Sequence, residues 1–430
     1  MAHVFHSLLT AIDVGTTKIS VLIAQKVGED SVKILGIGKA PSDGLERGVV
    51  VDVARTVQSI KQAIKEAELM AGCSITPAFV GISGSHINSF NTHGAVPIKR
   101  FQVMSSDIQA VLAVAQTVPI EEGQKVLHAL PQYFKVDGKD RIINPLGLHG
   151  VRLEAVVHVI TGAVSSIQNL IKCCELAGVV VKDIVLEQLA SADGVLSYDE
   201  RMLGVGMLDI GGGTSDFAVY QQESIRYTKV FPIAGNFFTK DLAVGLRATL
   251  QDAERFKKEH GSVSLFERDE VVERSSEAQS SDLIRGTSQY MSKYMIESVQ
   301  RNTVHEVNLQ QSNFILHARA FELLALVHDE IRKASLAPMM TAGIVITGGG
   351  SLLKGIDELA KKVLGLPVRL GAPRVDCSFS QSLCSPIYAT GYGLLKYALR
   401  KEAMIGLDSM QGPMVQKIFI KMKSWVDLFF

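Results

Sequence analysis

The sequence predicts an α/β protein built from two similar halves, because glycine-rich turns of one kind recur along its 430 residues. The turns read DVGTTK at 13–18, DIGGGT at 209–214 and TGGGS at 347–351, and each follows a short apolar run typical of a strand. The first two share the pattern Asp-x-Gly, which indicates a duplicated domain. A chain of this length suits two lobes of roughly 200 residues each.

The composition of the turns is typical of phosphate binding. Glycines let a backbone turn tightly and present its N–H groups to an anion, and Thr or Ser hydroxyls add donors. Asp13 and Asp209 are placed to hold Mg²⁺, directly or through water, because that ion prefers oxygen ligands and keeps much of its hydration. Ordinary glycine-rich hairpin turns are the alternative for any single motif, whereas three in order favour a nucleotide gripped between two halves.

The segments that follow the first two turns separate them from other phosphate loops. Residues 19–25 (ISVLIAQ) and 216–220 (DFAVY) are β-rich, so both turns are expected at hairpin tips. A Walker A loop and a dinucleotide fingerprint instead open a helix.

The other elements follow from apolar periodicity. Before the second turn we expect strands at 8–14, 19–25, 32–38, 78–82 and 179–186, and helices at 53–71, 165–177 and 187–196. After the third turn we expect helices at 352–364 and 388–400. The opening order of three strands, a helix and a strand begins an α/β unit.

Composition excludes several function classes. Lys plus Arg and Asp plus Glu both number 44, so no global field draws the protein to nucleic acid, and no basic patch interleaved with aromatics occurs. The five cysteines include no C-x-x-C pair, which favours reduced thiols and argues against a structural zinc. Residues 1–10 lack signal-peptide features and no apolar run reaches a membrane-spanning length, so we expect a cytoplasmic protein.

The ordered turns resemble those of the actin/Hsp70/hexokinase ATPase superfamily, in which the first two are phosphate motifs and the third an adenosine motif. Within it, the chain is similar to the FtsA family of bacterial cell-division proteins. The likeness covers nearly the whole chain from Leu9 onward and is carried by GVVVD (48–52), VGISGSHI (80–87), NPLGL (144–148), AGN (234–236), AERFK (253–257) and RLGAP (369–373).

The resemblance implies a two-lobed actin-like fold with a duplicated RNase H-like core, an FtsA-type 1C insertion and a C-terminal amphipathic helix. The domains it implies are lobe 1 core (1A) at 1–83 and 163–200, 1C at 84–162, lobe 2 core (2A) at 201–257 and 326–400, helical 2B at 258–325, a linker at 401–413 and a membrane-targeting helix at 414–430. An unremarkable α+β excursion is the alternative for 84–162.

The resemblance also implies binding of ATP and Mg²⁺. The phosphate residues would be Gly15, Thr16, Thr17 and Lys18 from one lobe and Gly211, Gly212, Gly213 and Thr214 from the other. The remaining nucleotide contacts would come from Gly235, Asn236, Glu254, Lys257, Gly348, Gly349, Gly350 and Ser351. A solvated lysine is the alternative for Lys18, and a surface i,i+3 ion pair for Glu254 and Lys257.

Hydrolysis is expected to be slow at most. Glu187 opens a helix at a place where superfamily members keep a residue that positions the attacking water. A glutamate in a first turn is equally a partner of the helix dipole.

The last seventeen residues, 414–430, have the pattern of an amphipathic helix. Ile420 and Leu428 fall among the polar residues, so the division is imperfect. A helix docked on the protein's own core is the alternative, but a terminal segment with lysines and a Trp favours an anionic membrane surface. The proposed membrane face consists of Val415, Ile418, Phe419, Met422, Trp425, Val426, Phe429 and Phe430.

The function implied by the resemblance is that of an ATP-binding protein which anchors the FtsZ ring to the cytoplasmic face of the inner membrane at the division site. It would recruit downstream divisome proteins and self-associate into protofilaments through its small subdomains. The FtsZ C-terminal tail would bind 317–322, with Arg319 as a contact; an ordinary solvated arginine is the alternative.

Other members of the superfamily offer rival functions. A sugar kinase needs a catalytic Asp in the first lobe, and none is evident after Ser83. A pilus-assembly homologue of the PilM type fits less well with a C-terminal membrane helix, and an Hsp70-type chaperone needs a substrate-binding domain.

Overall fold

The computed structural model describes residues 8–28, 31–265, 295–297, 304–375 and 381–408. In this part of the chain, two five-stranded sheets share one design: three consecutive antiparallel strands followed by two parallel ones. The first sheet runs β3 (Val32–Pro41), β2 (Lys18–Lys26), β1 (Leu8–Val14), β6 (Ala78–Ile82), β11 (Val181–Leu186). The second runs β14 (Ser224–Phe231), β13 (Ser215–Gln221), β12 (Val205–Ile210), β17 (Ile344–Thr347), β18 (Val368–Leu370). The duplication predicted from the two Asp-x-Gly turns is confirmed.

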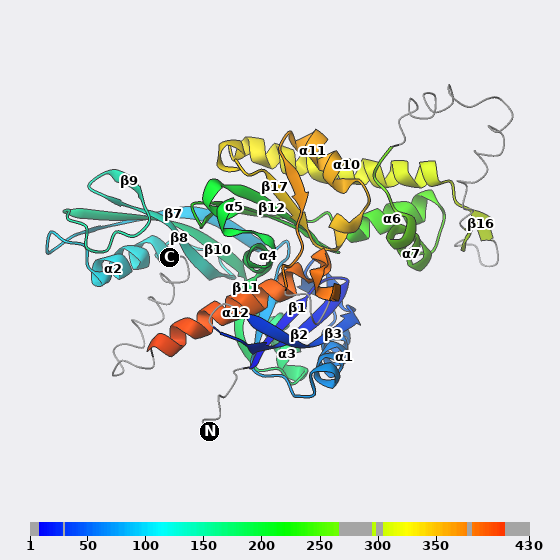
Figure 1. Ribbon diagram of the computed structural model, residues 1–430, viewed down its shortest axis with the longest axis horizontal. Helices are drawn as coiled ribbons and strands as arrows, with labels where there is room; N and C mark the ends of the chain where they lie inside the picture. Colours follow the sequence, from blue (N-terminus) through cyan, green and yellow to red (C-terminus); the bar gives the residue numbers. More distant parts are fainter. Residues whose placement is uncertain (1–7, 29–30, 266–294, 298–303, 376–380, 409–430) are drawn as a thin grey trace.

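Helices cover both faces of the first sheet. Successive side chains of β1 point to opposite faces, so Ile12 packs with α1 (Val53–Ala71) and α3 (Val164–Leu176), whereas Leu9 packs with α12 (Ala389–Asp408). Asp52 caps α1 by accepting from Arg55 N, as an N-cap carboxylate does. Figure 1 shows α12 beside β1 and β2, and α4 (Glu187–Val195) packs against α12.

A third sheet forms a separate unit at one end of the molecule (Figure 1). Its described strands run in the order β7 (Ile87–Pro97), β10 (Arg152–Ala163), β8 (Gln124–Val136), β9 (Lys139–Ile142), and α2 (Ser105–Gln116) packs on it through Val111 and Leu112. The chain leaves the first lobe after β6 and returns at α3, so this unit is an insertion.

The opposite end of the second lobe is helical. Here α6 (Gly235–Gly245), α7 (Leu250–His260) and α10 (Leu309–Lys333) share a core built around Phe238, Phe256 and Leu316, and α11 (Ile356–Leu364) packs on α10. Short elements complete the described fold: β4 (Leu45–Glu46), β5 (Val49–Val50), α5 (Tyr198–Leu203), β15 (Met295–Glu297), β16 (Val304–Glu306) and 3₁₀ turns at Ala337–Met339, Gly349–Leu352, Gln381–Cys384 and Pro386–Tyr388.

Several helix bounds differ from those expected. The helix expected from residue 352 begins at Ile356, because Gly349–Leu352 form a 3₁₀ turn and Gly355 has a φ of 80°. The boundary expected at 325/326 falls inside the continuous helix α10, and the helical unit begins with α6, before 258. Residues 401–408, expected as linker, continue α12 because Lys, Glu, Ala and Met favour a helix.

The C-terminal segment from residue 409 is the next feature. The proposed membrane helix at 414–430 and the rest of the linker, from 409, fall outside the described residues. Across the described ranges, no helix is both long and apolar enough to cross a membrane.

Candidate functional site

A cavity of about 450 Å³ lies between the two lobes, a size typical of ligand sites. Every residue proposed above to bind nucleotide lines it except Ser351, and Asp13, Asp209 and Glu187 line it too. Ser351 is buried, and its hydroxyl donates to Gly348 O at 2.7 Å, so it closes the third turn instead of facing the cavity.

The first two turns have the same geometry. Gly15 N–H donates to Lys18 O at 3.1 Å, and Gly211 N–H donates to Thr214 O at 3.0 Å. A Cβ at either glycine would lie 2.9 Å from the oxygen that closes its own turn. Glycine is therefore required at the same place in both hairpins, as a duplicated anion-binding turn predicts.

The turns also approach one another across the cleft. A Cβ on Gly212 would lie 2.3 Å from Thr17 Cγ2, and a Cβ on Gly213 would lie 2.4 Å from Thr16 Oγ1. The third turn docks on the second, since a Cβ on Gly348 would lie 2.1 Å from Asp209 Oδ1. Glycines thus permit all three turns to meet around one space.

Carboxyl groups gather at the floor of the cavity. Burial, followed by the charge of Asp13, raises the pKa of Asp209 to about 6, against hydrogen bonds from Ser191 and Thr390. Burial and the neighbouring charge of Asp209 raise the pKa of Asp216 to about 7. The pKa of Glu187 is raised well above its usual range by burial and then by Asp13, Asp216 and Asp209. A cation among these groups would stabilise their charged forms.

Asp216 was missed by sequence reasoning. It pairs with Asp209 across the β12–β13 hairpin, just as Ser20 pairs with Asp13 across β1–β2. Ser20 Oγ donates to Asp13 Oδ2 at 3.3 Å. A signal for Asp216 was present in the sequence: it follows Asp209 by seven positions, the same spacing as from Asp13 to Ser20. Other residues that line the cavity were not predicted to belong to the site, among them Lys39, Gly48, Ser83, Lys258 and Thr390.

Lys18 is held in place at the cavity wall. Its Nζ lies 3.5 Å from Asp13 Oδ2, donates to Ile387 O at 2.6 Å, and lies 5.0 Å from the centre of the Tyr388 ring. The side chain is only 15% exposed, so the alternative of a solvated lysine is wrong.

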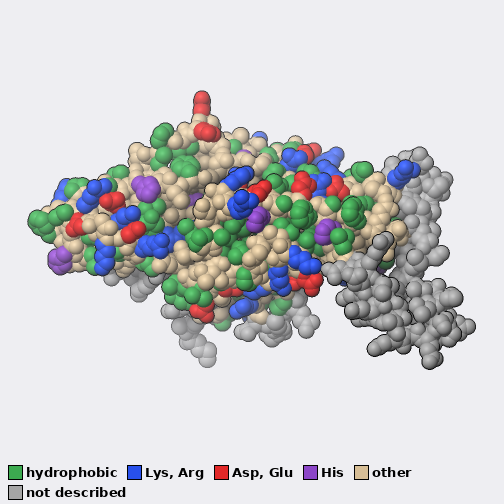
Figure 2. Space-filling model, turned by 90° about the horizontal axis from the view of Figure 1, so that it is seen from above, with side chains coloured by type: hydrophobic (Ala, Val, Ile, Leu, Met, Phe, Trp, Pro, Cys, Tyr) green, Lys and Arg blue, Asp and Glu red, His purple; other side chains and the backbone are tan. Residues whose placement is uncertain are grey.

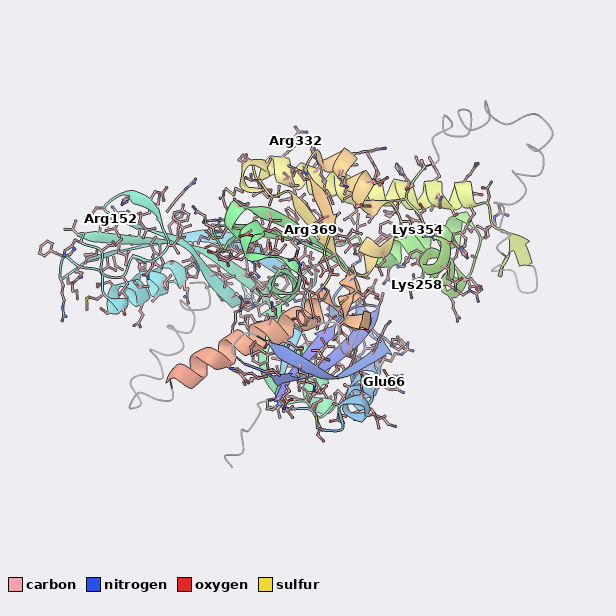
Figure 3. The ribbon with its side chains drawn as sticks, viewed as in Figure 1. Glu66, Arg152, Lys258, Arg332, Lys354 and Arg369 are labelled. Atoms are coloured by element: carbon pink, nitrogen blue, oxygen red, sulfur yellow. The ribbon has the colours of Figure 1, made fainter. Side chains whose placement is uncertain are left out.

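Glu254 and Lys257 form the i,i+3 ion pair that was the alternative interpretation, at 2.6 Å. The pair lines the cavity, and the Lys257 side chain is 12% exposed. Lys257 Nζ also donates to Gly235 O at 3.0 Å and to Thr239 Oγ1 at 2.8 Å. The pair therefore belongs to the wall of the site and joins α7 to the start of α6. Figure 3 shows the neighbouring Lys258, which also lines the cavity.

Two further motif residues lie outside the cavity. Arg319 in α10 donates to Asp241 Oδ2 at 2.5 Å and Asp241 Oδ1 at 3.0 Å, and it pairs with Glu322. The alternative of an ordinary solvated arginine is wrong, because this side chain is 21% exposed. Arg369 (Figure 3), in the segment 369–373, donates to both Glu200 oxygens at 2.5 and 2.7 Å and thus ties β18 to α5.

Comparison with known proteins assigns the family. The family model described as "Cell division protein FtsA" matches residues 206–393, and that described as "SHS2 domain inserted in FTSA" matches residues 84–161. The cell division protein FtsA of Pseudomonas aeruginosa is 41% identical over 398 residues, which cover 92% of this chain and 90% of that protein. The chain belongs to the FtsA family.

FtsA proteins of other bacteria extend this likeness over the whole length. The protein of Neisseria meningitidis is 36% identical and that of Escherichia coli 35%, each over 97% of this chain and at least 96% of the relative. The match to the inserted SHS2 domain coincides with the unit formed by β7–β10 and α2. Membership in the FtsA family establishes an actin-like role in cell division.

Solved structures confirm the actin-like fold. The chain resembles the PilM–PilN type IV pilus biogenesis complex with a TM-score of 0.62 at 16% identity, over 90% of this chain and 97% of that one. It resembles MreB5 of Spiroplasma citri bound to ADP with a TM-score of 0.53 at 14% identity, over 94% and 99%. Identities this low support the fold alone, so the PilM-like alternative is weaker than membership in the FtsA family.

Proposed function

We propose that the protein binds Mg-ATP in the cleft between its lobes and links FtsZ filaments to the cytoplasmic face of the inner membrane at the division site. The observation that carries the nucleotide part is the single cavity lined by all three glycine-rich turns and by the Glu254–Lys257 pair. Backbone N–H groups at such turns bind phosphates. The MreB5 structures bound to ADP and AMPPNP have the same fold.

Asp13 and Asp209 are the residues that would hold Mg²⁺. The donor set fits this ion, because it consists of carboxylates that burial and then their mutual charge hold at raised pKa, about 6 for Asp209 and about 7 for Asp216. Bound Mg²⁺ would neutralise clustered charge on the phosphates. No group of three or more His, Cys, Asp or Glu side chains in the described ranges is arranged to hold a metal alone, so phosphate oxygens and water would complete the shell.

Hydrolysis in this proposal is slow. Glu187, the residue placed to position water, has a pKa raised well above its usual range by burial and then by neighbouring carboxyl groups. A cation among these carboxyl groups would favour the charged form of Glu187. ATP then serves chiefly to fix the relation between the two lobes.

The proposed FtsZ surface is on α10. Arg319 is oriented by Asp241, and Phe314 and Phe321, seven positions apart on another face of the same helix, are 63% and 50% exposed. The helix therefore presents both a cation and exposed aromatic side chains, which suit a peptide with acidic and apolar groups.

The proposed self-association surface is at the far end of the inserted unit. Phe101, Leu146 and Val151 are 67%, 52% and 55% exposed, and backbone hydrogen bonds hold their loops together. Figure 2 shows a small group of hydrophobic side chains at the tip of this end, among charged side chains and His. Downstream divisome proteins are further candidates for the same surface, and residues 414–430 are the proposed membrane anchor.

Co-pelleting of the purified protein with anionic liposomes, with and without FtsZ polymers, tests the proposal. The protein should pellet with lipid alone and should carry FtsZ to lipid only when Mg-ATP is present. Failure to bring FtsZ to the membrane under any nucleotide condition would contradict the tethering function.

A further inference from the structure

Phe237, in the first turn of α6, lies where the two lobes meet outside the cavity. The guanidinium carbon of Arg47, from the β4–β5 turn of the first lobe, lies 5.6 Å from the centre of its ring. Arg319 of α10 lies 5.4 Å from the same centre, and Lys240 lies 5.9 Å from it. Cations within about 6 Å of an aromatic face are attracted by the ring quadrupole. One ring therefore contacts the first lobe and the proposed partner surface together.

Arg47 is attached to the first phosphate turn. The next residue, Gly48, donates its N–H to Thr16 Oγ1 at 3.0 Å. A Cβ on Gly48 would lie 2.5 Å from Ser83 O, and Arg47 itself has a φ of 49°, in the left-handed region. The β4–β5 turn therefore packs closely against the cavity wall, and the hydrogen bond of Gly48 ties Arg47 to Thr16.

Phe237 is attached to the second phosphate turn. Gly235 N–H donates to Gly211 O at 3.0 Å, and Asn236 N–H donates to Gly212 O at 2.8 Å. These residues immediately precede Phe237 in α6. The contact between Arg47 and Phe237 therefore joins the segment attached to the first phosphate turn to the helix attached to the second.

Arg319 contacts a second residue of α6 besides Phe237. Asp241 lies one turn further along α6 and accepts two hydrogen bonds from Arg319, at 2.5 and 3.0 Å. Such a bidentate contact fixes the plane of the guanidinium group. The ring of Phe237 and the carboxylate of Asp241 thus set the orientation of Arg319 from the same helix.

We propose that Arg47, Phe237 and Arg319 form a clasp that couples nucleotide occupancy of the cleft to the partner surface on α10. This inference rests on the proposed function, since it takes the cleft as the ATP site and α10 as the FtsZ surface. With nucleotide bound, Arg47 covers Phe237 and Arg319 is held in a single orientation. The partner then binds a surface that is already ordered and loses less conformational entropy.

Coupling between two sites is reciprocal, so each ligand tightens the other by the same factor. The test is the affinity of a fluorescein-labelled FtsZ C-terminal tail peptide for the full-length protein, with and without saturating Mg-AMPPNP. We expect the nucleotide to tighten the peptide about fivefold, at the lower end of typical couplings. Two variants should reduce this factor to about one: Arg47→Ala, which removes the cation, and Phe237→Leu, which removes the ring but keeps its apolar bulk.

Arg332→Ala is the matched control, because it removes an arginine from the last turn of α10, far from the clasp (Figure 3). It should keep the wild-type factor. A wild-type protein that binds both ligands without coupling, or an Arg47→Ala protein that keeps the full factor, would overturn the clasp and leave the proposed function intact. A wild-type protein that binds neither ligand would overturn both.

Discussion

Ser83 Oγ, just after β6 in the first lobe, donates a hydrogen bond of 2.6 Å to Asp216 Oδ1 in β13 of the second lobe. Both side chains are buried, at 4% and 3% exposure. Gln188 Nε2, from α4, donates to the same oxygen at 2.6 Å. The floor of the cavity is therefore a direct polar link between the two lobes.

Loss of this link should destabilise the protein. Ser83→Ala leaves a buried carboxyl group with one donor fewer, and we expect the free energy of unfolding to fall by about 1–3 kcal/mol. Denaturation in urea, followed by circular dichroism, measures the change. Ser106→Ala, at an exposed position in α2, is the control and should unfold at the wild-type urea concentration. Equal stability of both variants would mean that the bond contributes nothing.

His158 should make the insertion sensitive to acid. Its Nε2 lies 2.9 Å from Thr228 Oγ1 in β14 and its Nδ1 lies 2.7 Å from Asn91 Oδ1, and burial lowers its pKa to about 4. The unfolded chain has a pKa near 6.5 at this residue and binds the proton first. The stabilising contribution of neutral His158 is therefore present above about pH 6.5 and is lost as the pH falls towards 4.

The measurement is the difference in unfolding free energy between wild type and His158→Gln. The pKa values of Asp209 and Asp216 are raised to about 6 and 7 in the folded protein, so protonation of these two groups stabilises the fold as the pH falls through the same range. The stability of wild type alone would therefore mix this effect with that of His158. The difference should shrink by about 3 kcal/mol between pH 6.5 and 4. A gap that stays constant with pH would contradict neutral burial of this histidine.

Charge reversal at Arg319 should remove FtsZ binding. Arg319→Glu places a carboxylate beside Asp241 and Glu322, which now pair with the arginine. We expect co-sedimentation with FtsZ polymers to be abolished and affinity for the ATP analogue to stay within about twofold, since Arg319 does not line the cavity. The control is Arg332→Glu on the same helix; if Arg319→Glu still sediments with FtsZ, the contact lies elsewhere.

Removal of residues 414–430 should release the protein from anionic liposomes. The apolar positions expected on one helical face supply the membrane affinity, and Lys417, Lys421 and Lys423 add on the order of 1 kcal/mol each near an anionic leaflet. Trp425→Glu should act in the same way, with ATP affinity unchanged in both variants. A truncated protein that still floats with lipid would show that the anchor is a different segment.

The parts of the site that the sequence predicts depend on local chemistry. The turns at 13–18 and 209–214 are recognisable because the need for glycine arises inside each turn. A Cβ on Gly15 or Gly211 would meet the carbonyl oxygen of the residue three positions later in the same turn. Their recurrence also predicts the duplicated sheets. Helix α1 was predicted with its observed bounds because its start, apolar spacing and stop are all local.

The parts that escaped prediction depend on contacts between distant segments. Asp216 accepts hydrogen bonds from Ser83 and Gln188, which lie 133 and 28 residues away. The continuation of α12 to Asp408 is accompanied by ion pairs from Lys401 to Asp183 and from Glu402 to Lys182. Neither set of contacts can be predicted from local sequence, because each depends on how the strands and helices pack in the folded protein.

The most direct test of the account is titration of the folded protein with a fluorescent ATP analogue in the presence of Mg²⁺. Asp209→Ala and Asp13→Ala should each weaken binding by at least about tenfold, because each removes a carboxylate proposed for the metal's shell. Asp199→Ala, at an exposed position in α5, should bind like wild type. Unchanged affinity in both folded cavity variants would contradict the proposed nucleotide site.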